Sequence, residues 1–152
     1  MTVRLATPVD AAVVARLLIA FNTEFDAPVP TRADLERRFR LLLARPEVLV
    51  LLGGERDAPR GFALATLRPS PYYDGPLAVL DELYVAPAHR GRGLGGRLVR
   101  SLEHELRARG CGELHINVDE VDDGARRFYT AHGFLNLEPG TTSRMLCYLK
   151  EL

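Results

Sequence analysis

Hydrophobic and polar residues alternate along this chain with two different periods, one typical of helices and one typical of strands. Apolar residues recur at helical spacing in four stretches, which predicts helices near residues 13–25, 35–43, 94–106 and 124–132. Runs with strand character fall at residues 3–6, 47–52, 61–67, 77–85, 114–118 and 142–149. The predicted order is a strand, two helices, a run of strands, then strand, helix, strand, helix and a last strand.

This order does not alternate regularly between strands and helices, so it indicates a mixed α/β (α+β) fold built in layers. At 152 residues the chain is long enough for one domain with its own hydrophobic core. No internal repeat, low-complexity segment or evident linker divides it. We therefore expect a single domain over residues 1–152.

The charged residues balance, with 20 Lys and Arg against 20 Asp and Glu. A neutral chain lacks the basic surface of a nucleic-acid-binding protein, so no such partner is expected. No apolar run reaches the roughly 20 residues of a membrane span, and Arg4 interrupts the N-terminus before a signal-peptide core forms. The two cysteines, Cys111 and Cys147, lack Cys-x-x-Cys spacing and flanking metal ligands. These features predict a cytoplasmic protein without a bound metal.

The most distinctive stretch runs from Leu80 to Gly96, where a strand ends at Pro87 and a turn rich in Gly and Arg opens into a helix. The first amides of a helix have no partner inside it, and the helix dipole makes that end positive. Arg90 and Arg92 add cationic side chains at the same place. The turn is therefore a predicted binding site for a phosphorylated cofactor.

Other interpretations of the turn are weaker. Gly91-x-Gly93-x-x-Gly96 matches the dinucleotide fingerprint G-x-G-x-x-G, but that fingerprint opens a long doubly wound sheet and this turn lies past the midpoint of the chain. The P-loop pattern fails because no Gly-Lys-Ser/Thr follows. A turn that uses glycine only for tight geometry is a further alternative, although two arginines and four glycines exceed that need.

Two motifs carry a family resemblance. Arg90-x-x-Gly93-x-Gly95, directly after a strand, resembles the acetyl-CoA signature of the GCN5-related N-acetyltransferases, the GNAT superfamily. The segment Ala125-Arg-Arg-Phe-Tyr-Thr-Ala-His-Gly-Phe134 resembles their second signature, Ala-x-x-Phe-Tyr-x-x-x-Gly-Phe. The order of elements also matches the family from end to end. The chain departs from the pattern at Asp122, where the family often has Asn.

The resemblance implies a mostly antiparallel central sheet of six to seven strands, flanked by about four helices, with strands 4 and 5 splayed apart. It implies acetyl-CoA (coenzyme A) as the donor, with the turn around its pyrophosphate and the preceding strand along its pantetheine arm. Homodimerisation through the late strands is a further expectation. The resemblance indicates these cofactor-binding residues: Leu83, Tyr84, Val85, Arg90, Gly91, Arg92, Gly93, Leu94, Gly95, Gly96, Asn117, Asp122, Arg126 and Tyr129.

Acetyl transfer to an amine needs a proton acceptor, because a lysine-like amine has a pKa near 10.4 and is charged at neutral pH. Asp81 and Glu82 are the candidates; strand alternation predicts that they point to opposite faces, with Asp81 slightly favoured. By the resemblance, the Leu83 N–H stabilises the negative charge on the carbonyl oxygen. Tyr129 is the predicted general acid, since a phenol with a pKa near 10 stays protonated. A purely structural role is the alternative for each side chain.

The resemblance assigns the acceptor pocket to the loop after the first helix, the loop before the fourth strand and the C-terminal strands. Here those parts supply Glu24, Phe25, Asp26, Tyr72, Tyr73 and Asp74. Acids interleaved with aromatic rings suit a small cationic amine, although the same residues could be solvated loop positions. We predict an N-acetyltransferase in which a primary amine, on a small molecule or a protein, attacks directly in a ternary complex. The alternatives are a non-catalytic acyl-CoA sensor or subunit and a nucleotide-binding oxidoreductase fragment.

Overall fold

The computed structural model describes residues 1–152, which form two compact units, Met1–Ile116 and Asn117–Leu152. The first unit is built on a five-stranded sheet in the order β1-β2-β3-β4-β5. Neighbouring strands are antiparallel except for the last pair, in which β5 runs parallel to β4. The strands are β1 Thr2–Leu5, β2 Val48–Glu55, β3 Ala58–Arg68, β4 Leu77–Val85 and β5 Leu114–His115.

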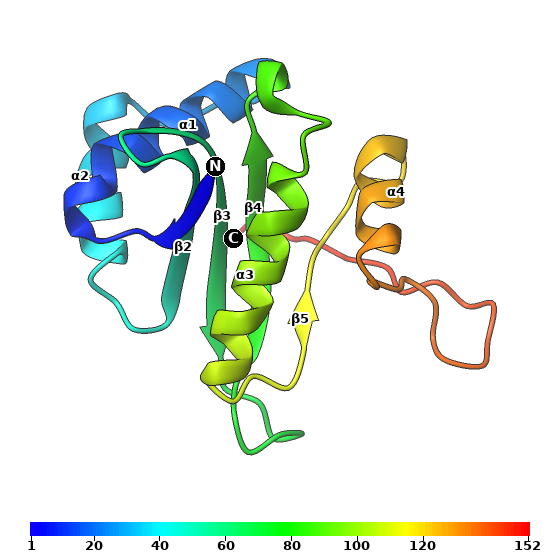
Figure 1. Ribbon diagram of the computed structural model, residues 1–152. Helices are drawn as coiled ribbons and strands as arrows, with labels where there is room; N and C mark the ends of the chain where they lie inside the picture. The colour runs from blue at the N-terminus through cyan, green and yellow to red at the C-terminus, as the bar shows by residue number, and fades with distance from the viewer. The chain divides into compact units, whose positions relative to one another are not determined.

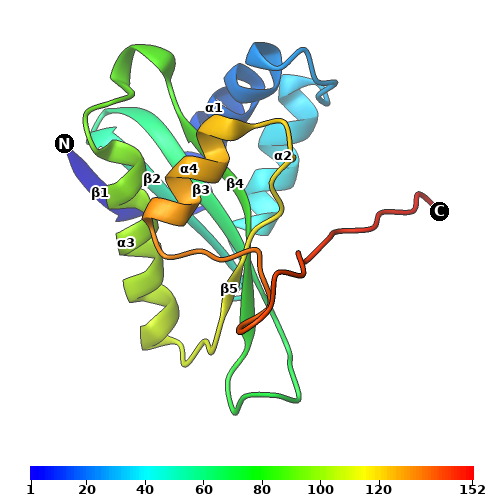
Figure 2. The same cartoon turned by 90° about the vertical axis from the view of Figure 1, so that its right-hand side faces the viewer.

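Three helices cover the two faces of this sheet. α1 (Ala11–Glu24) and α2 (Arg32–Leu42) lie on one face and α3 (Leu94–Ala108) on the other, as Figure 1 and Figure 2 show from two sides. Under α1 and α2, buried helix residues pack against Phe62 and Tyr84 of the sheet. Because apolar side chains are buried on both faces, β2, β3 and β4 are nearly continuous apolar runs. No helix in the protein combines the length and the apolar character needed to cross a membrane.

Local capping groups mark the ends of the helices. A one-turn 3-10 helix, Pro8–Asp10, leads into α1. The Thr31 hydroxyl accepts a hydrogen bond from the backbone N–H of Asp34 at 3.2 Å and so caps α2. Beyond the end of α3, Gly110 has a φ of +72°, the left-handed conformation that glycine adopts without steric cost.

Two glycines let α3 approach the sheet closely. A Cβ atom at Gly53 would lie 2.8 Å from the Leu94 side chain and 3.2 Å from the Leu98 side chain. A Cβ atom at Gly61 would lie 2.6 Å from the backbone oxygen of Tyr84. Both leucines of α3 are buried, so they have little freedom to move aside. Glycine at these positions therefore sets how near the first turns of α3 come to β2 and β3.

The sheet has five strands, fewer than the six to seven predicted. The strand expected at residues 114–118 is limited to Leu114–His115, because only these two residues pair with β4, at Ala78 and Val79. Side-chain alternation alone predicts the longer strand. A strand forms only where a neighbour accepts and donates its backbone hydrogen bonds, and that neighbour is not encoded locally.

The second unit contains α4 (Asp123–Ala131) followed by extended chain. The prediction of a strand at residues 142–149 is wrong: the pairing in this part is a single isolated bridge between Leu137 and Arg144. The segment has the apolar composition of a buried strand but no partner strand. Its large apolar side chains are exposed: Met145, Leu146, Tyr148 and Leu149.

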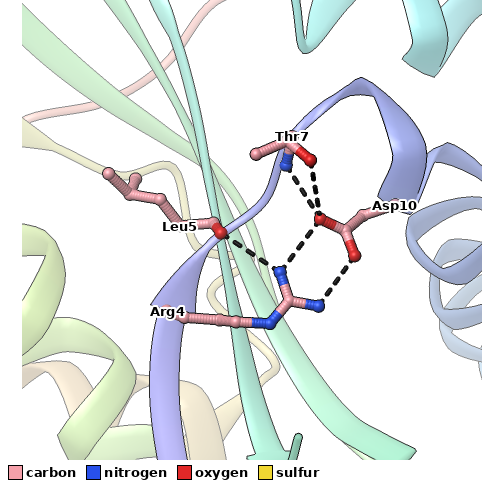
Figure 3. A network of polar contacts seen from close by, with 4 residues as sticks. All are labelled: Arg4, Leu5, Thr7 and Asp10. Carbon is pink, nitrogen blue, oxygen red and sulfur yellow. Dashed lines mark hydrogen bonds and ion pairs between the residues drawn. The ribbon is translucent and has the colours of Figure 1, made fainter. Parts of the chain in front are cut away.

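A buried ion pair joins β1 to the start of α1 (Figure 3). Asp10 is 8% exposed, and its carboxylate accepts hydrogen bonds from Arg4 Nη1 at 2.9 Å and Nη2 at 2.7 Å. The Thr7 N–H donates a further bond to it at 2.9 Å. These bonds, above all the one from Arg4, outweigh the cost of burial and lower the pKa of Asp10 to about 2.

Asp10 should make the stability of the protein sensitive to acid. Its pKa is lower in the folded chain than in the unfolded chain, so its contribution is complete above about pH 5 and is lost as the pH falls toward about 2. Asp10→Asn should lower the free energy of unfolding at neutral pH by about 2 kcal/mol. Urea denaturation at neutral and acidic pH measures this, with exposed Asp74→Asn as the control. An Asp10→Asn variant that keeps the full acid sensitivity would contradict the assignment.

Candidate active site

β4 contains one more residue than the stretch of β3 opposite it. The register pairs Leu64 with Glu82 and Ala65 with Leu80, which leaves Asp81 without a partner in β3. Such an extra residue is a β-bulge, and the alternation of the strand is shifted by one position beyond it. The bulge lies within the part of β4 that contains the predicted proton acceptors and the Leu83 amide.

The bulge places both carboxylates on one face of the sheet, so the prediction of opposite faces is wrong. Asp81 accepts a hydrogen bond from Thr66 Oγ1 at 2.8 Å. Thr66 pairs with Val48, which packs in the core under α1 and α2. Glu82 pairs with Leu64, which packs in the same core. Strict alternation fails because Asp81 is the inserted residue.

The two carboxylates have different surroundings. Glu82 is half-buried, and this desolvation, reinforced by the negative charge of Asp81, raises the pKa of Glu82 above its ordinary value. Asp81 is exposed and is held by Thr66. A carboxyl group with a raised pKa is the better proton acceptor near neutral pH, because it returns the proton less readily. Burial therefore distinguishes Glu82 from Asp81 as a proton acceptor, although the sequence alone does not.

The edge of β4 that faces β5 is open over most of its length. β5 pairs with β4 at two residues only, so the predicted splay of these two strands is confirmed. Before the bulge, the Ala78 N–H points toward this edge and donates to the Glu113 oxygen at 2.9 Å. Beyond the two paired positions, no strand accepts hydrogen bonds from β4 on that side.

The bulge also decides which amides of β4 face the open edge. Past the end of β4, the Ala86 N–H donates to the Arg60 oxygen on the β3 side at 2.8 Å. Successive amides of a strand point to opposite edges, so the N–H groups of Leu83 and Val85 point toward the open edge. The Tyr84 amide points toward β3, and the Tyr84 ring is buried in the core.

The turn between β4 and α3 presents further amides. A short 3-10 helix, Pro87–His89, follows β4. Gly91 and Gly93 have φ values of +71° and +79°, and a Cβ atom at either would meet no other atom within 4 Å. These glycines therefore adopt the left-handed conformation beside open space. Residues 94–96 form the first turn of α3, where amides have no partner inside the helix.

The two arginines of the turn have different partners. Arg92 is exposed and makes no hydrogen bond or ion pair within the protein. Arg90 donates from Nη1 and Nη2 to the two carboxylate oxygens of Glu24, each at 2.7 Å. Its Nε donates to the backbone oxygen of Val85 at 2.8 Å. A predicted cofactor residue thus binds a predicted acceptor residue, and Arg92 is the cation of the turn that lacks a partner.

The predicted acceptor residues do not all come together. Glu24 ends α1, Phe25 follows it with 57% exposure, and Asp26 has a φ of +49°. This group lies near the turn. Tyr72 and Tyr73 belong to the loop between β3 and β4, which lies at the other end of β4 from the turn (Figure 1). There the Tyr73 hydroxyl donates to the Glu113 carboxylate at 2.6 Å, and Tyr72 is 86% exposed.

The second signature lies on α4 in the second unit. Tyr129 is 9% exposed, and its ring contacts those of Phe128 and Phe134 edge to face, each with centroids 5.3 Å apart. Asp122 accepts a hydrogen bond from the Ala125 N–H at 2.8 Å, so its carboxylate caps α4. The other predicted cofactor residues of this unit are exposed: Asn117 and Arg126.

Two features of the site were missing from the sequence-based prediction. The first is Thr66, whose hydroxyl holds Asp81; nothing in its local sequence marks it. The second is the bulge, for which a signal exists, because Leu80 and Leu83 are apolar residues three apart with two acids between them. A regular strand with one buried face repeats every two residues. No group of three or more His, Cys, Asp or Glu side chains is arranged to hold a metal ion.

Comparison with known proteins places this geometry in a family. Residues 14–134 match the Acetyltransferase (GNAT) family. An Aminoglycoside N(6')-acetyltransferase type 1 of Stenotrophomonas maltophilia is 32% identical over 149 residues, which cover 95% of this chain and 92% of that protein. The protein of the same name from Klebsiella aerogenes is 30% identical over 112 residues, 72% of this chain and 70% of that protein.

Solved structures agree on the fold. A crystal structure from Arthrobacter sp. FB24, whose protein is assigned to the acetyltransferases, has a TM-score of 0.93 at 49% identity and covers 100% of this chain and 96% of its own. An aminoglycoside acetyltransferase from an uncultured soil metagenomic sample, in complex with sisomicin, has a TM-score of 0.81 at 19% identity, with 99% and 95% coverage. The family match includes β4, the glycine-rich turn and the α4 signature. This chain therefore belongs to the GNAT family and is an acetyltransferase.

Proposed function

We propose that the protein transfers an acetyl group from acetyl-CoA to a primary amine of a small polycationic molecule, with aminoglycosides as the first class to test. The observation that carries this proposal is a continuous row of amides, from Leu83 and Val85 at the open edge of β4 to the turn and the start of α3. The pantetheine arm is an amide chain that can extend a strand edge, and a pyrophosphate suits a helix N-terminus.

The residues of the turn fit the phosphates of coenzyme A. Gly91 and Gly93 leave open space where a side chain would otherwise stand, so a ligand can approach the backbone closely. Arg92 supplies an unpaired positive charge beside the amides of residues 94–96. When bound, acetyl-CoA would supply the thioester carbonyl carbon that the amine attacks.

Three groups of the protein accept a proton, stabilise the negative charge on the carbonyl oxygen and donate a proton. Glu82, directly or through water, accepts a proton from the attacking ammonium group. The Leu83 N–H donates to the carbonyl oxygen as negative charge grows there. As the carbon–nitrogen bond forms and the carbon–sulfur bond breaks, the Tyr129 hydroxyl donates a proton to the sulfur. The nitrogen then gives its second proton to the Tyr129 oxygen, directly or through water, which restores the hydroxyl. The raised pKa of Glu82 is the reason for preferring it to Asp81.

The acidic groups support a cationic acceptor. Asp81 and Glu82 lie on the α1 face of the sheet, and Asp26 follows the end of α1. Carboxylates attract and orient ammonium groups. The full-length relatives named as aminoglycoside N(6')-acetyltransferases point to the same class of amine. Homodimerisation stays a prediction from the resemblance, and a cytoplasmic location stays a prediction from the composition. The exposed apolar side chains after α4 offer a surface for a dimer.

Ligand binding followed by turnover tests the proposed function. Acetyl-CoA and CoA should raise the melting temperature, and NAD and NADP should leave it unchanged, because the amide row suits an acyl-CoA. Thiol release from acetyl-CoA should then depend on an added amine. Aminoglycosides with a 6′-amine should be faster acceptors than matched ones with a 6′-hydroxyl. Stabilisation by NAD alone would contradict the donor, and CoA binding without thiol release for any amine would support a sensor.

The pH dependence of turnover should identify the proton acceptor. Glu82→Gln should lower kcat about 100-fold or more and remove the acidic limb of the kcat/KM profile. Asp81→Asn should retain turnover and move the acidic limb to lower pH, because the like charge that raises the pKa of Glu82 is gone. Asparagine can still accept the Thr66 hydrogen bond, which makes this variant a matched control. Loss of turnover in Asp81→Asn alone would reverse the assignment.

Removal of one hydroxyl tests the general acid. Tyr129→Phe should lower kcat about 100-fold while the Kd for CoA changes little, since only the proton donor to the sulfur is lost. Tyr148→Phe, at an exposed tyrosine of the same unit, should behave like the unaltered protein. A donor with a more acidic thiol leaving group should partly restore the Tyr129→Phe rate. Unchanged kcat in Tyr129→Phe would exclude the hydroxyl from the reaction.

A further inference from the structure

Arg90 and Glu24 belong to two different predicted sites, the donor turn and the acceptor segment, yet they bind each other. The guanidinium and the carboxylate form a two-pronged pair with both distances at 2.7 Å. Nε of Arg90 is also committed, to the backbone oxygen of Val85 at 2.8 Å. Three of the five N–H donors of the guanidinium are therefore used within the protein.

The surroundings hold this pair in place. The Glu24 side chain is 27% exposed, and the Arg90 guanidinium lies 5.9 Å above the centre of the Tyr84 ring. The Tyr84 ring in turn lies 5.3 Å from that of Phe21, on α1. If Arg90 turned toward a phosphate, the Glu24 carboxylate, whose side chain is only 27% exposed, would lose both hydrogen bonds from the guanidinium. The geometry thus favours Arg90 as a link between α1 and the turn, and leaves phosphate binding to Arg92 and the amides.

The segment after Glu24 depends on the end of α1 for its position. The N–H groups of Phe25 and Asp26 donate back to carbonyl oxygens of α1 at 3.2 and 3.3 Å. Residues 28–30, with the sequence Pro-Val-Pro, make no backbone hydrogen bond before α2 is reached at Thr31. Between its ends, only the Val29 side chain packs against the core, so the position of this segment depends strongly on the helix that precedes it.

We propose that Arg90 is a positioning residue that couples the donor turn to the acceptor segment, residues 25–31. A ligand that orders the turn also orders Arg90, and Arg90 then fixes the end of α1 through Glu24. Binding of the donor would therefore steady the segment that meets the amine, and by the same linkage a bound amine would steady the donor turn. This inference rests on the proposed function, because it requires the turn to bind an acyl-CoA.

Hydrogen exchange of residues 25–31 tests the coupling, first in the free protein and then with saturating CoA. The variants are Arg90→Met and Glu24→Met, which keep an unbranched stem, and Arg92→Met is the matched control. In the free protein, both variants should speed exchange of this segment about fivefold or more, and the double variant no further. CoA should slow the exchange in the unaltered protein and in Arg92→Met at saturation, but not in the two variants.

Steady-state kinetics distinguish this coupling from general destabilisation, because only the KM for the amine should change. Arg90→Met and Glu24→Met should each raise the KM for the amine about fivefold or more, with kcat and the Kd for CoA nearly unchanged. Arg92→Met should weaken CoA binding and spare the KM for the amine. If Glu24→Met instead tightens CoA binding and Arg90→Met weakens it more than Arg92→Met does, Arg90 is a phosphate ligand and the coupling is wrong.

The free-protein exchange separates failure of this inference from failure of the proposed function. If the unaltered protein does not bind CoA, the proposed function fails, and the exchange rates of the free variants still show whether Arg90 positions residues 25–31. If CoA binds and the variants exchange like the unaltered protein, the proposed function stands and the coupling through Arg90 is overturned.

Discussion

The extra residue in β4 is the constraint on which the candidate site depends. Side chains and amides of a strand both alternate, so one inserted residue changes the direction of both at once. It brings Asp81 and Glu82 to the face under α1, and it turns the Leu83 amide toward the edge that β5 leaves open. A half-buried acid and an outward amide therefore stand at adjacent positions, an arrangement that a regular strand would not produce.

The sequence predicts well what local interactions determine. The four helices lie where the spacing of apolar residues predicts them, with local caps such as Thr31 and Gly110, because a helix satisfies its hydrogen bonds within a few residues. Strand lengths are predicted less well, since β5 ends where pairing with β4 ends. The faces of Asp81 and Glu82 require the register between β3 and β4. The Arg90–Glu24 pair joins residues 66 positions apart, and neither side chain indicates the other in advance.

Donor and acceptor sites differ in what they require of the sequence. The amides at the β4 edge and at the start of α3 belong to the backbone. Any sequence that keeps the bulge, Gly91 and Gly93 and the separation of β4 from β5 therefore presents these amides. The predicted acceptor residues are instead side chains, and Phe25 and Asp26 lie on the short segment between α1 and α2. The fold itself is retained at low identity, as the solved structure with 19% identity and a TM-score of 0.81 shows.

The glycines under α3 have a consequence for the interpretation of variants. The first turn of α3 carries part of the amide row, and its height above the sheet is set by Gly53, where a Cβ atom would stand 2.8 Å from Leu94. A methyl group there would push against the buried Leu94 side chain in the first turn of α3, and so disturb the amides of that turn. The resulting loss of affinity would look like the loss of a ligand contact. Position 53 would then be assigned to the binding site, although its effect would be that of a spacer beneath it.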